Sequence, residues 1–217
     1  IGSGLVGSEM CIRDRSLVRM PKFAEKQVGY LALSLMLDSR IDLRDRMEPQ
    51  LVEDLRSPKE TLTSVALNYL SVWDNKLPIR RSLLDLVYQL MVSPTSSSAV
   101  AKKAALTYTH FFRGQPQVFL EDMEEWQSRV ERVLAILSGS SLGVATSVVS
   151  LLIQIAKTAP ESFGDMAVNI VTHKLSDVFE ESVDDSNDYV YYSNPAPWLV
   201  TKLCRLLLLL PVPVSYT

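Results

Sequence analysis

The 217-residue chain contains few residues whose types and spacing could do chemistry. Its two histidines, His110 and His173, are too far apart in sequence for the i, i+4 pair or the Cys/His cluster that a metal site requires. No G-x-S-x-G sequence, Walker-type loop or nucleophile with a plausible base is present. We therefore expect no catalytic, metal-binding or cofactor-binding residue, and we expect both histidines to lie on solvated helix faces.

Two patterns resemble ligand sites but lack an essential part. The first is a G-x-G-x-x-G sequence formed by Gly2, Gly4 and Gly7. A dinucleotide-binding fold places this sequence after a buried strand, and only Ile1 precedes it here. The second is an acidic stretch containing Asp184, Asp185, Asn187 and Asp188. It lacks the central Gly and the terminal Glu of a calcium-binding EF-hand loop, so we expect a flexible acidic connector.

Three groups of basic residues remain as candidates for binding a partner: Arg80-Arg81, Lys102-Lys103, and Lys202 with Arg205. On adjacent stacked helices these groups could line one groove and attract an acidic partner or anionic lipid. The alternative, which we favour, is that they form the solvent face of amphipathic helices. A net charge of −3 and a pI near 5.5 argue against a nucleic-acid partner for the chain as a whole.

The elements that carry these residues are predicted to be helices. Apolar residues recur at i, i+3, i+4 and i+7 along most of the chain, whereas no stretch alternates apolar and polar residues for long enough to predict a strand. Four stripes show this spacing: Ala101, Ala104, Ala105, Tyr108, Phe111 and Phe112; Trp126, Val130, Val133, Leu134 and Leu137; Val144, Val148, Leu151, Leu152 and Ile155; and Leu199, Leu203, Leu206, Leu207 and Leu210.

Prolines separate these stretches, at Ser57-Pro58, Ser93-Pro94, Gln115-Pro116, Ala159-Pro160 and Asn194-Pro195. We place each proline near the start of the next helix, where its missing N–H is not needed. The sequence therefore predicts an all-α chain of about nine or ten helices.

The helices also recur at a nearly constant interval. Small residues that would let a helix approach its neighbour occur at Gly29, Ala66, Ala105 and Ala145, at separations of 37, 39 and 40 residues. This period is typical of an α-α superhelix, a HEAT/armadillo-like solenoid of antiparallel helix pairs. The alternative is a closed helical bundle, which has no reason to keep a constant pair length. The leucine run 206–210 covers every side of a helix, so we expect that helix to have several neighbours.

The sequence offers no segment that we expect to span a membrane. The 24 residues from Val133 to Ala156 are uncharged, but residues 138–141 divide them into pieces shorter than the roughly 20 apolar residues that a bilayer requires. We interpret residues 1–15, and the matching residues 213–217, as translated sequencing-adaptor sequence rather than native protein. Without Cys11, only Cys204 remains in the native part, so a reducing cytosolic setting is expected.

Several sequence stretches resemble the trunks of adaptin large chains. Glu25–Leu31 reads EKQVGYL and is similar to the E-K-[QR]-[IV]-G-Y-L signature of that family. Trp126–Val130, Leu142–Thr146 and Ala159–Phe163 resemble the same trunks. The most specific stretch is Asp188–Leu199 with the following K-L-x-R-L-L, which resembles the D-Y-x-Y-Y-x-x-P-A-P-W-L segment of the alpha-adaptin branch. Other branches usually carry D-P-F-L-Q there, so Pro197-Trp198 favours the alpha branch.

The resemblance covers about residues 17–211, and it implies a non-catalytic scaffold subunit of a clathrin adaptor complex. Residues 16–212 would then be a partial trunk solenoid. The implied partners are a beta-type large chain, a medium chain and a small sigma chain, and indirectly clathrin and cargo, in clathrin-mediated endocytosis. The implied location is the cytoplasmic face of the plasma membrane, in coated pits. The family's lipid-binding lysines lie upstream of this sequence, so no residue here is assigned to lipid, cargo or a particular partner.

Two other interpretations remain open. The chain could belong to another adaptin or to a coatomer large chain. It could also be a HEAT-repeat scaffold of nuclear transport or of a phosphatase assembly, which would share the helix period but not the Tyr-Tyr to Trp-Leu segment.

Residues 16–212 expressed alone should be helical but prone to self-association, because a partial solenoid exposes apolar helix faces that capping repeats otherwise cover. Circular dichroism and light scattering test this. A monomer with a cooperative thermal transition would contradict it.

Overall fold

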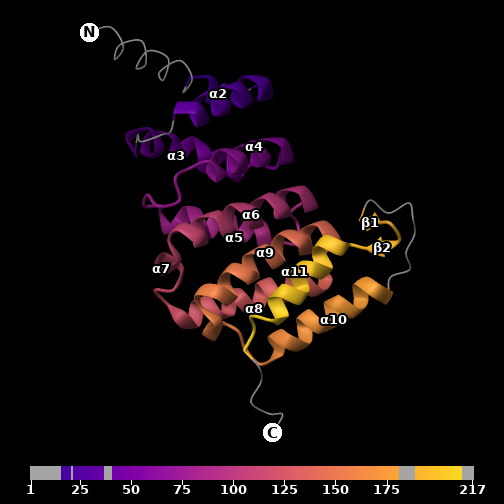
Figure 1. Ribbon diagram of the computed structural model, residues 1–217. Helices are drawn as coiled ribbons and strands as arrows, with labels where there is room; N and C mark the ends of the chain where they lie inside the picture. Colours follow the sequence, from indigo (N-terminus) through magenta and orange to yellow (C-terminus); the bar gives the residue numbers. More distant parts are fainter. Residues whose placement is uncertain (1–15, 21, 37–40, 181–188, 212–217) are drawn as a thin grey trace. The chain divides into compact units, whose positions relative to one another are not determined.

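The computed structural model describes residues 16–20, 22–36, 41–180 and 189–211 (Figure 1). Ten α-helices account for most of this described part: α2 (Phe23–Met36), α3 (Ile41–Leu55), α4 (Glu60–Ser71), α5 (Arg81–Val92), α6 (Ser98–Gly114), α7 (Pro116–Phe119), α8 (Met123–Gly139), α9 (Leu142–Thr158), α10 (Met166–Glu180) and α11 (Pro197–Leu207). A 3₁₀ turn, η1 (Pro160–Ser162), and two short strands, β1 (Val190–Tyr191) and β2 (Asn194–Pro195), complete it. The predicted all-α class is confirmed.

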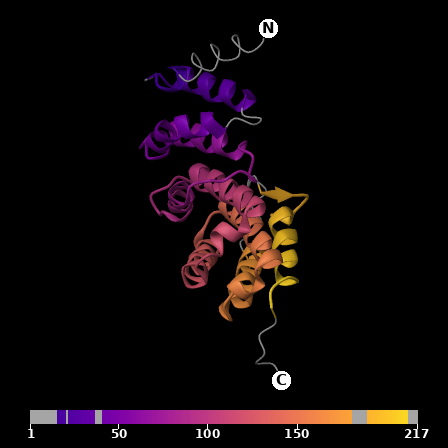
Figure 2. The same ribbon diagram turned by 90° about the vertical axis from the view of Figure 1, so that its left-hand side faces the viewer.

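The chain divides into two compact units, residues 1–87 and 88–217, and the boundary falls within α5. In the first unit α4 packs against both α2 and α3. In the second unit α8 and α9 form a pair, joined at residues 140–141. In that unit α9 packs on α6 and α11, and α10 packs on α8 and α11. Figures 1 and 2 show α10 and α11 side by side.

Helix α9 is the centre of the second unit, because α6, α8 and α11 all pack against it. The predicted stripe from Val144 to Ile155 is buried, and residues outside the stripe, such as Val149, Ile153 and Ala156, are buried too. A helix that is apolar nearly all round needs neighbours on several sides. The other predicted stripes on α6 and α8 are also buried, which confirms those predictions.

The predicted small residues lie at helix contacts. Ala66, Ala105 and Ala145 are fully buried, and Gly29 is also buried. Aromatic rings fill the space beside α6, where Phe112 and Trp126 stack with ring centroids 5.3 Å apart and Phe119 meets both rings at steep angles. Trp126 donates a hydrogen bond from Nε1 to Ser162 Oγ at 2.9 Å, so its polar atom is satisfied in the core.

Some predicted helix starts differ from the structure. Pro116 begins only the four-residue α7, and Pro160 begins η1 rather than α10. Pro195 lies in β2, and it is Pro197 that occupies the first turn of α11. Proline fixes φ in any tight turn, so it marks the end of the preceding helix better than the identity of the next element.

The leucine run does not continue α11 as predicted. The helix ends at Leu207 and the next residues form a turn, in which Leu208 is 87% exposed while Leu210 is buried. Among the described residues α9 and α10 both pack against α11, so this helix has more than one neighbour, as expected, although the leucine run is helical only as far as Leu207. The short antiparallel pair β1–β2, in register Tyr191↔Asn194, was also not predicted.

Some predictions concern residues outside the described part of the chain. These are the interpretations of residues 1–15 and 213–217, including Gly2, Gly4, Gly7 and Cys11, and the acidic stretch 184–188. In the part that is described, none of the helices has the length and apolar character needed to cross a membrane.

Candidate functional site

The two histidines lie on separate helices and form no common site. His173 on α10 is exposed, as predicted, and its Nδ1 lies 3.1 Å from Asp177 Oδ1 one turn away. His110 on α6 is more buried than predicted, and its ring packs edge-on against Phe111 at 5.3 Å. No group of three His, Cys, Asp or Glu suited to a metal ion occurs in the described ranges.

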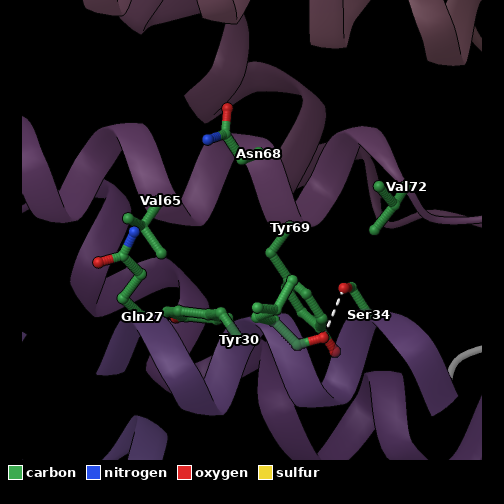
Figure 3. Close-up of a pocket in the computed structure, with 8 residues that line it drawn as sticks. Gln27, Tyr30, Ser34, Val65, Asn68, Tyr69 and Val72 are labelled. Atoms are coloured by element: carbon green, nitrogen blue, oxygen red, sulfur yellow. Dashed lines mark hydrogen bonds between the residues drawn. The ribbon is translucent and has the colours of Figure 1, made fainter. Parts of the chain in front are cut away.

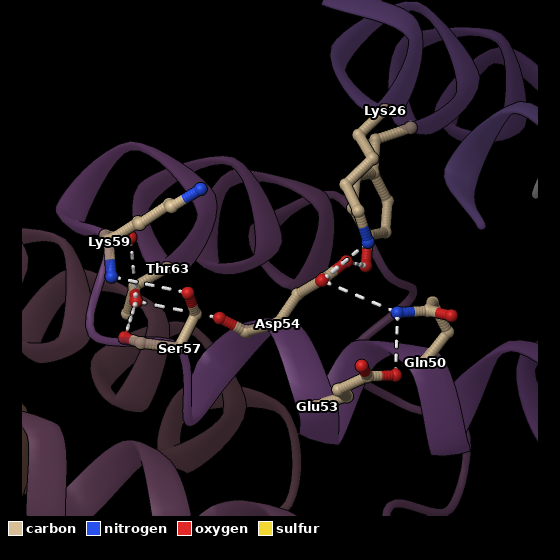
Figure 4. A network of polar contacts seen from close by, with 8 residues as sticks. Lys26, Gln50, Glu53, Asp54, Ser57, Lys59 and Thr63 are labelled. Carbon is tan, nitrogen blue, oxygen red and sulfur yellow. Dashed lines mark hydrogen bonds and ion pairs between the residues drawn. The ribbon is translucent and has the colours of Figure 1, made fainter. Parts of the chain in front are cut away.

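The EKQVGYL motif places a charged side chain in the core of the first unit. Lys26 on α2 donates to Asp54 Oδ1 on α3 at 2.6 Å, and Tyr30 donates to Asp54 Oδ2 at 2.7 Å (Figure 4). The side chains of Lys26 and Asp54 are only 8% and 4% exposed. Gln50 adds a weaker contact from Nε2 to Asp54 Oδ1 at 3.4 Å. Both carboxylate oxygens of Asp54 therefore accept hydrogen bonds within the protein.

This arrangement fixes the protonation state of Tyr30. Burial, together with the adjacent Asp54 carboxylate, raises the pKa of the Tyr30 hydroxyl far above its usual value. Tyr30 is therefore neutral at neutral pH and donates its hydroxyl hydrogen to Asp54. The motif thus makes a structural contact between α2 and α3.

A groove lies between α2 and α4 in the first unit (Figure 3). It is lined by Gln27, Tyr30, Leu31, Ser34, Val65, Asn68, Tyr69 and Val72, with a volume of about 240 Å³. Burial raises the pKa of Tyr69 to about 12, so this ring is also neutral. The groove is smaller than a typical site for a small molecule and presents no titrating group near neutral pH, so it does not resemble a cofactor site.

The alpha-type segment forms an aromatic hairpin in the second unit. Tyr192 and Ser193 form its two-residue turn with φ of 48° and 60°, and Ala196 has φ of 37°. These left-handed conformations normally require Gly, Asn or Asp, so three of them within five residues store strain. Tyr192 is nevertheless 83% exposed, and its ring meets Tyr191 edge-on at 4.6 Å. Trp198 packs 5.5 Å from Tyr191.

The hairpin is anchored on the first turn of α9. A Cβ atom at Gly143 would collide with the Tyr189 hydroxyl, so any larger residue here would require the Tyr189 side chain to shift. The same Cβ would lie 3.2 Å from Lys102 Cδ on α6. The backbone N–H of Ala196 donates to Tyr189 O at 2.8 Å and closes the hairpin base. Residues 142–146 and residues 189–199, which resemble the family at separate places in the sequence, therefore contact one another in the structure.

The basic groups do not all lie on a solvent face. Arg80 is exposed, but its Nε lies 3.2 Å from Glu48 Oε2. The Glu48 carboxylate therefore balances the charge of Arg80. Lys202 turns inward and donates to Thr146 O at 3.0 Å and Ser150 Oγ at 2.8 Å on α9. Burial lowers the pKa of Lys202. Arg205 is exposed, as predicted, and Lys102 and Lys103 are half-buried.

Comparison with known proteins gives a consistent result. The Adaptin N terminal region family matches residues 15–212, which confirms the predicted resemblance. The AP-2 complex subunit alpha-2 of Dictyostelium discoideum is 31% identical over 198 residues, which are 91% of this chain and 19% of that protein. The AP-2 complex subunit alpha-1 of Arabidopsis thaliana is 30% identical over 196 residues, covering 90% of this chain and 19% of its own length. The AP-2 complex subunit alpha of Saccharomyces cerevisiae is 27% identical over 207 residues, and the match covers 89% of this chain and 20% of that protein. The chain thus spans about a fifth of the length of these relatives.

Replacing Lys26 by Met or Asp54 by Leu should each cost about 3–5 kcal/mol of stability, because either change leaves the other charge buried without its partner. The double variant K26M/D54L should lose much less than the sum of the two, because no charge remains in the interface. Unfolding in urea, followed by Trp73 fluorescence in a W126F/W198F background, measures the free energy of unfolding of the first unit. Glu53→Ala, on the exposed side of α3, is the control and should change stability by less than about 0.5 kcal/mol. Single variants as stable as this control would contradict the assignment.

Proposed function

Because this chain belongs to the adaptin N-terminal region family, we propose that it is part of a large scaffold subunit of a clathrin adaptor complex. In this role it supports coat assembly and cargo selection in clathrin-mediated endocytosis and in vesicle-mediated protein transport. The observation that carries the proposal is the 27–31% identity to alpha subunits of AP-2 complexes over about nine-tenths of the chain.

The proposed partners are a beta-type large chain, a medium chain and a small sigma chain, with clathrin and cargo reached through them. The proposed location is the cytoplasmic side of the plasma membrane, in coated pits. Residues 16–212 would be the trunk segment, and residues 1–15 and 213–217 sequence of other origin. The aromatic hairpin supports the alpha type, because it is built from the segment that distinguishes alpha-type chains in the sequence.

The proposal assigns no catalysis to the chain. Two of its polar groups join helices to one another: Asp54 binds Lys26 and Tyr30, and Lys202 binds α9. Helix pairs that stack on one another leave extended faces for binding, which suits a scaffold. A coatomer large chain or another adaptin is the alternative, separable by the partners that co-purify.

The full-length protein, tagged in the cells that produce it, should co-purify with beta-type, medium and small sigma chains in equal amounts. The reason is that obligate interfaces are large and apolar and so survive washing. Quantitative mass spectrometry of the purified complex measures the ratios, and the tag expressed alone is the control. Recovery of coatomer subunits, nuclear transport factors or a phosphatase in place of these chains would contradict the proposal.

A further inference from the structure

Arg44 on α3 is a buried cation in the first unit, only 4% exposed. Its Nη2 donates to the backbone oxygen of Asp74 at 3.2 Å, and its guanidinium lies 4.8 Å from the centre of the Trp73 ring. The ion pairs found among the described residues do not include Arg44. The side chain of Asp74 is exposed, and its Oδ1 accepts from the backbone N–H of Lys76. The charge of Arg44 is therefore only partly balanced by the residues that the structure describes.

Two buried polar atoms at this place have no hydrogen-bond partner within the protein. They are Nη1 of Arg44 and the hydroxyl oxygen of Tyr69 on α4, a residue that is 2% exposed. Burial raises the pKa of the Tyr69 hydroxyl to about 12, and the nearby charge of Arg44 opposes that rise. Both side chains also contact Trp73, since the Tyr69 ring meets the Trp73 ring edge-on at 5.8 Å. The two atoms therefore belong to one buried cluster.

The chemistry of these two atoms calls for an acceptor. A guanidinium can only donate, and a neutral tyrosine hydroxyl has one hydrogen to donate. Buried polar groups in native proteins are nearly always hydrogen-bonded, and a buried charge is normally paired. Because Arg44 is positive, an acceptor that carries negative charge would satisfy both requirements.

We infer that Arg44 and Tyr69 bind a small monovalent anion of the size of chloride. The anion accepts hydrogen bonds from Arg44 Nη1 and from the Tyr69 hydroxyl, and it balances the guanidinium charge. Since Arg44 lies on α3 and Tyr69 on α4, the anion joins these two helices and stabilises the first unit. This inference goes beyond the proposed function and does not depend on it.

The donor set favours an anion over a water molecule. A water molecule brings two hydrogens that need acceptors of their own. The nearby Asp74 carbonyl already accepts from Arg44 Nη2 and from the backbone N–H of Leu77. A water molecule would also leave the charge of Arg44 as it is.

The same donor set favours a monatomic anion over phosphate or sulfate. Those anions present several oxygens, each of which needs donors when it is buried. Arg44 Nη1 and the Tyr69 hydroxyl supply too few hydrogens for them.

The stability of the first unit should depend on chloride. The full chain in the W126F/W198F background is unfolded in urea while sodium chloride replaces sodium gluconate at constant ionic strength, which keeps charge screening equal. The unfolding equilibrium constant, followed by Trp73 fluorescence, should fall about tenfold between zero and about 200 mM chloride, as a dissociation constant near 20 mM gives.

Three variants locate the effect. Arg44→Met removes the buried charge and should abolish the chloride response. Tyr69→Phe keeps the ring but removes one donor, and should weaken the response by at least about threefold. Arg46→Met removes the same charge from an exposed position on α3, and this control should keep the full response. A response that is absent in the parent chain, or equal in the parent chain and the Arg44 and Tyr69 variants, would overturn the inference.

Crystals of the full chain grown with sodium bromide provide a direct test that needs no variant. An anomalous bromide peak beside Arg44 Nη1 and the Tyr69 hydroxyl is the expected result. A water molecule at that place, without anomalous signal, would show that the site holds solvent and that the inference of an anion is wrong.

Discussion

The structure depends on one constraint: a helix in the middle of a stack must bury nearly all of its surface against its neighbours. Helix α9 meets this constraint, with eleven buried residues distributed around it and α6, α8 and α11 packed against it. At about 25 cal/mol per Å² of apolar surface, such a helix contributes far more by packing than by its own helical propensity. Helices with fewer neighbours keep exposed apolar residues, such as Leu35 on α2 and Leu208 after α11. This surface needs further cover, and the association expected of the isolated segment follows from it.

Polar contacts add specificity to this apolar stack. Three partly or wholly buried lysines each reach from one helix to an acceptor on a different element: Lys26 to Asp54 on α3, Lys174 to the Ser140 carbonyl between α8 and α9, and Lys202 to Thr146 and Ser150 on α9. The long alkyl chain of each lysine packs against apolar neighbours while the ammonium group reaches its acceptor. A shift of one helix along another would therefore leave the ammonium group without its acceptor. These contacts fix how the helices align along one another, which apolar packing alone specifies weakly.

Much of this fold could be predicted from the sequence, because helical periodicity and a repeat near 40 residues are local patterns. The stripes on α6, α8 and α9 and the small residues Ala66, Ala105 and Ala145 lie where the pattern predicts. Contacts between distant residues could not be predicted: nothing local pairs Lys26 with Asp54, and the family signature marked Lys26 and Tyr30 without their partner. The turn and the two short strands of the aromatic hairpin could not be predicted either, because Tyr192, Ser193 and Ala196 adopt conformations that their residue types disfavour. Its contacts are likewise not local: Tyr189 lies against Gly143 on α9, and Tyr191 packs on Trp198 of α11.

Hydrogen exchange of individual backbone amides tests the stacking of helices most directly, because protection reports how completely each helix is covered. The full chain should exchange slowest along α9 between Val144 and Ile155. The amides of α11 should exchange at least tenfold faster, since this helix is covered on fewer sides. Equal protection in the two helices, or faster exchange in α9, would contradict the account of a stack built around α9.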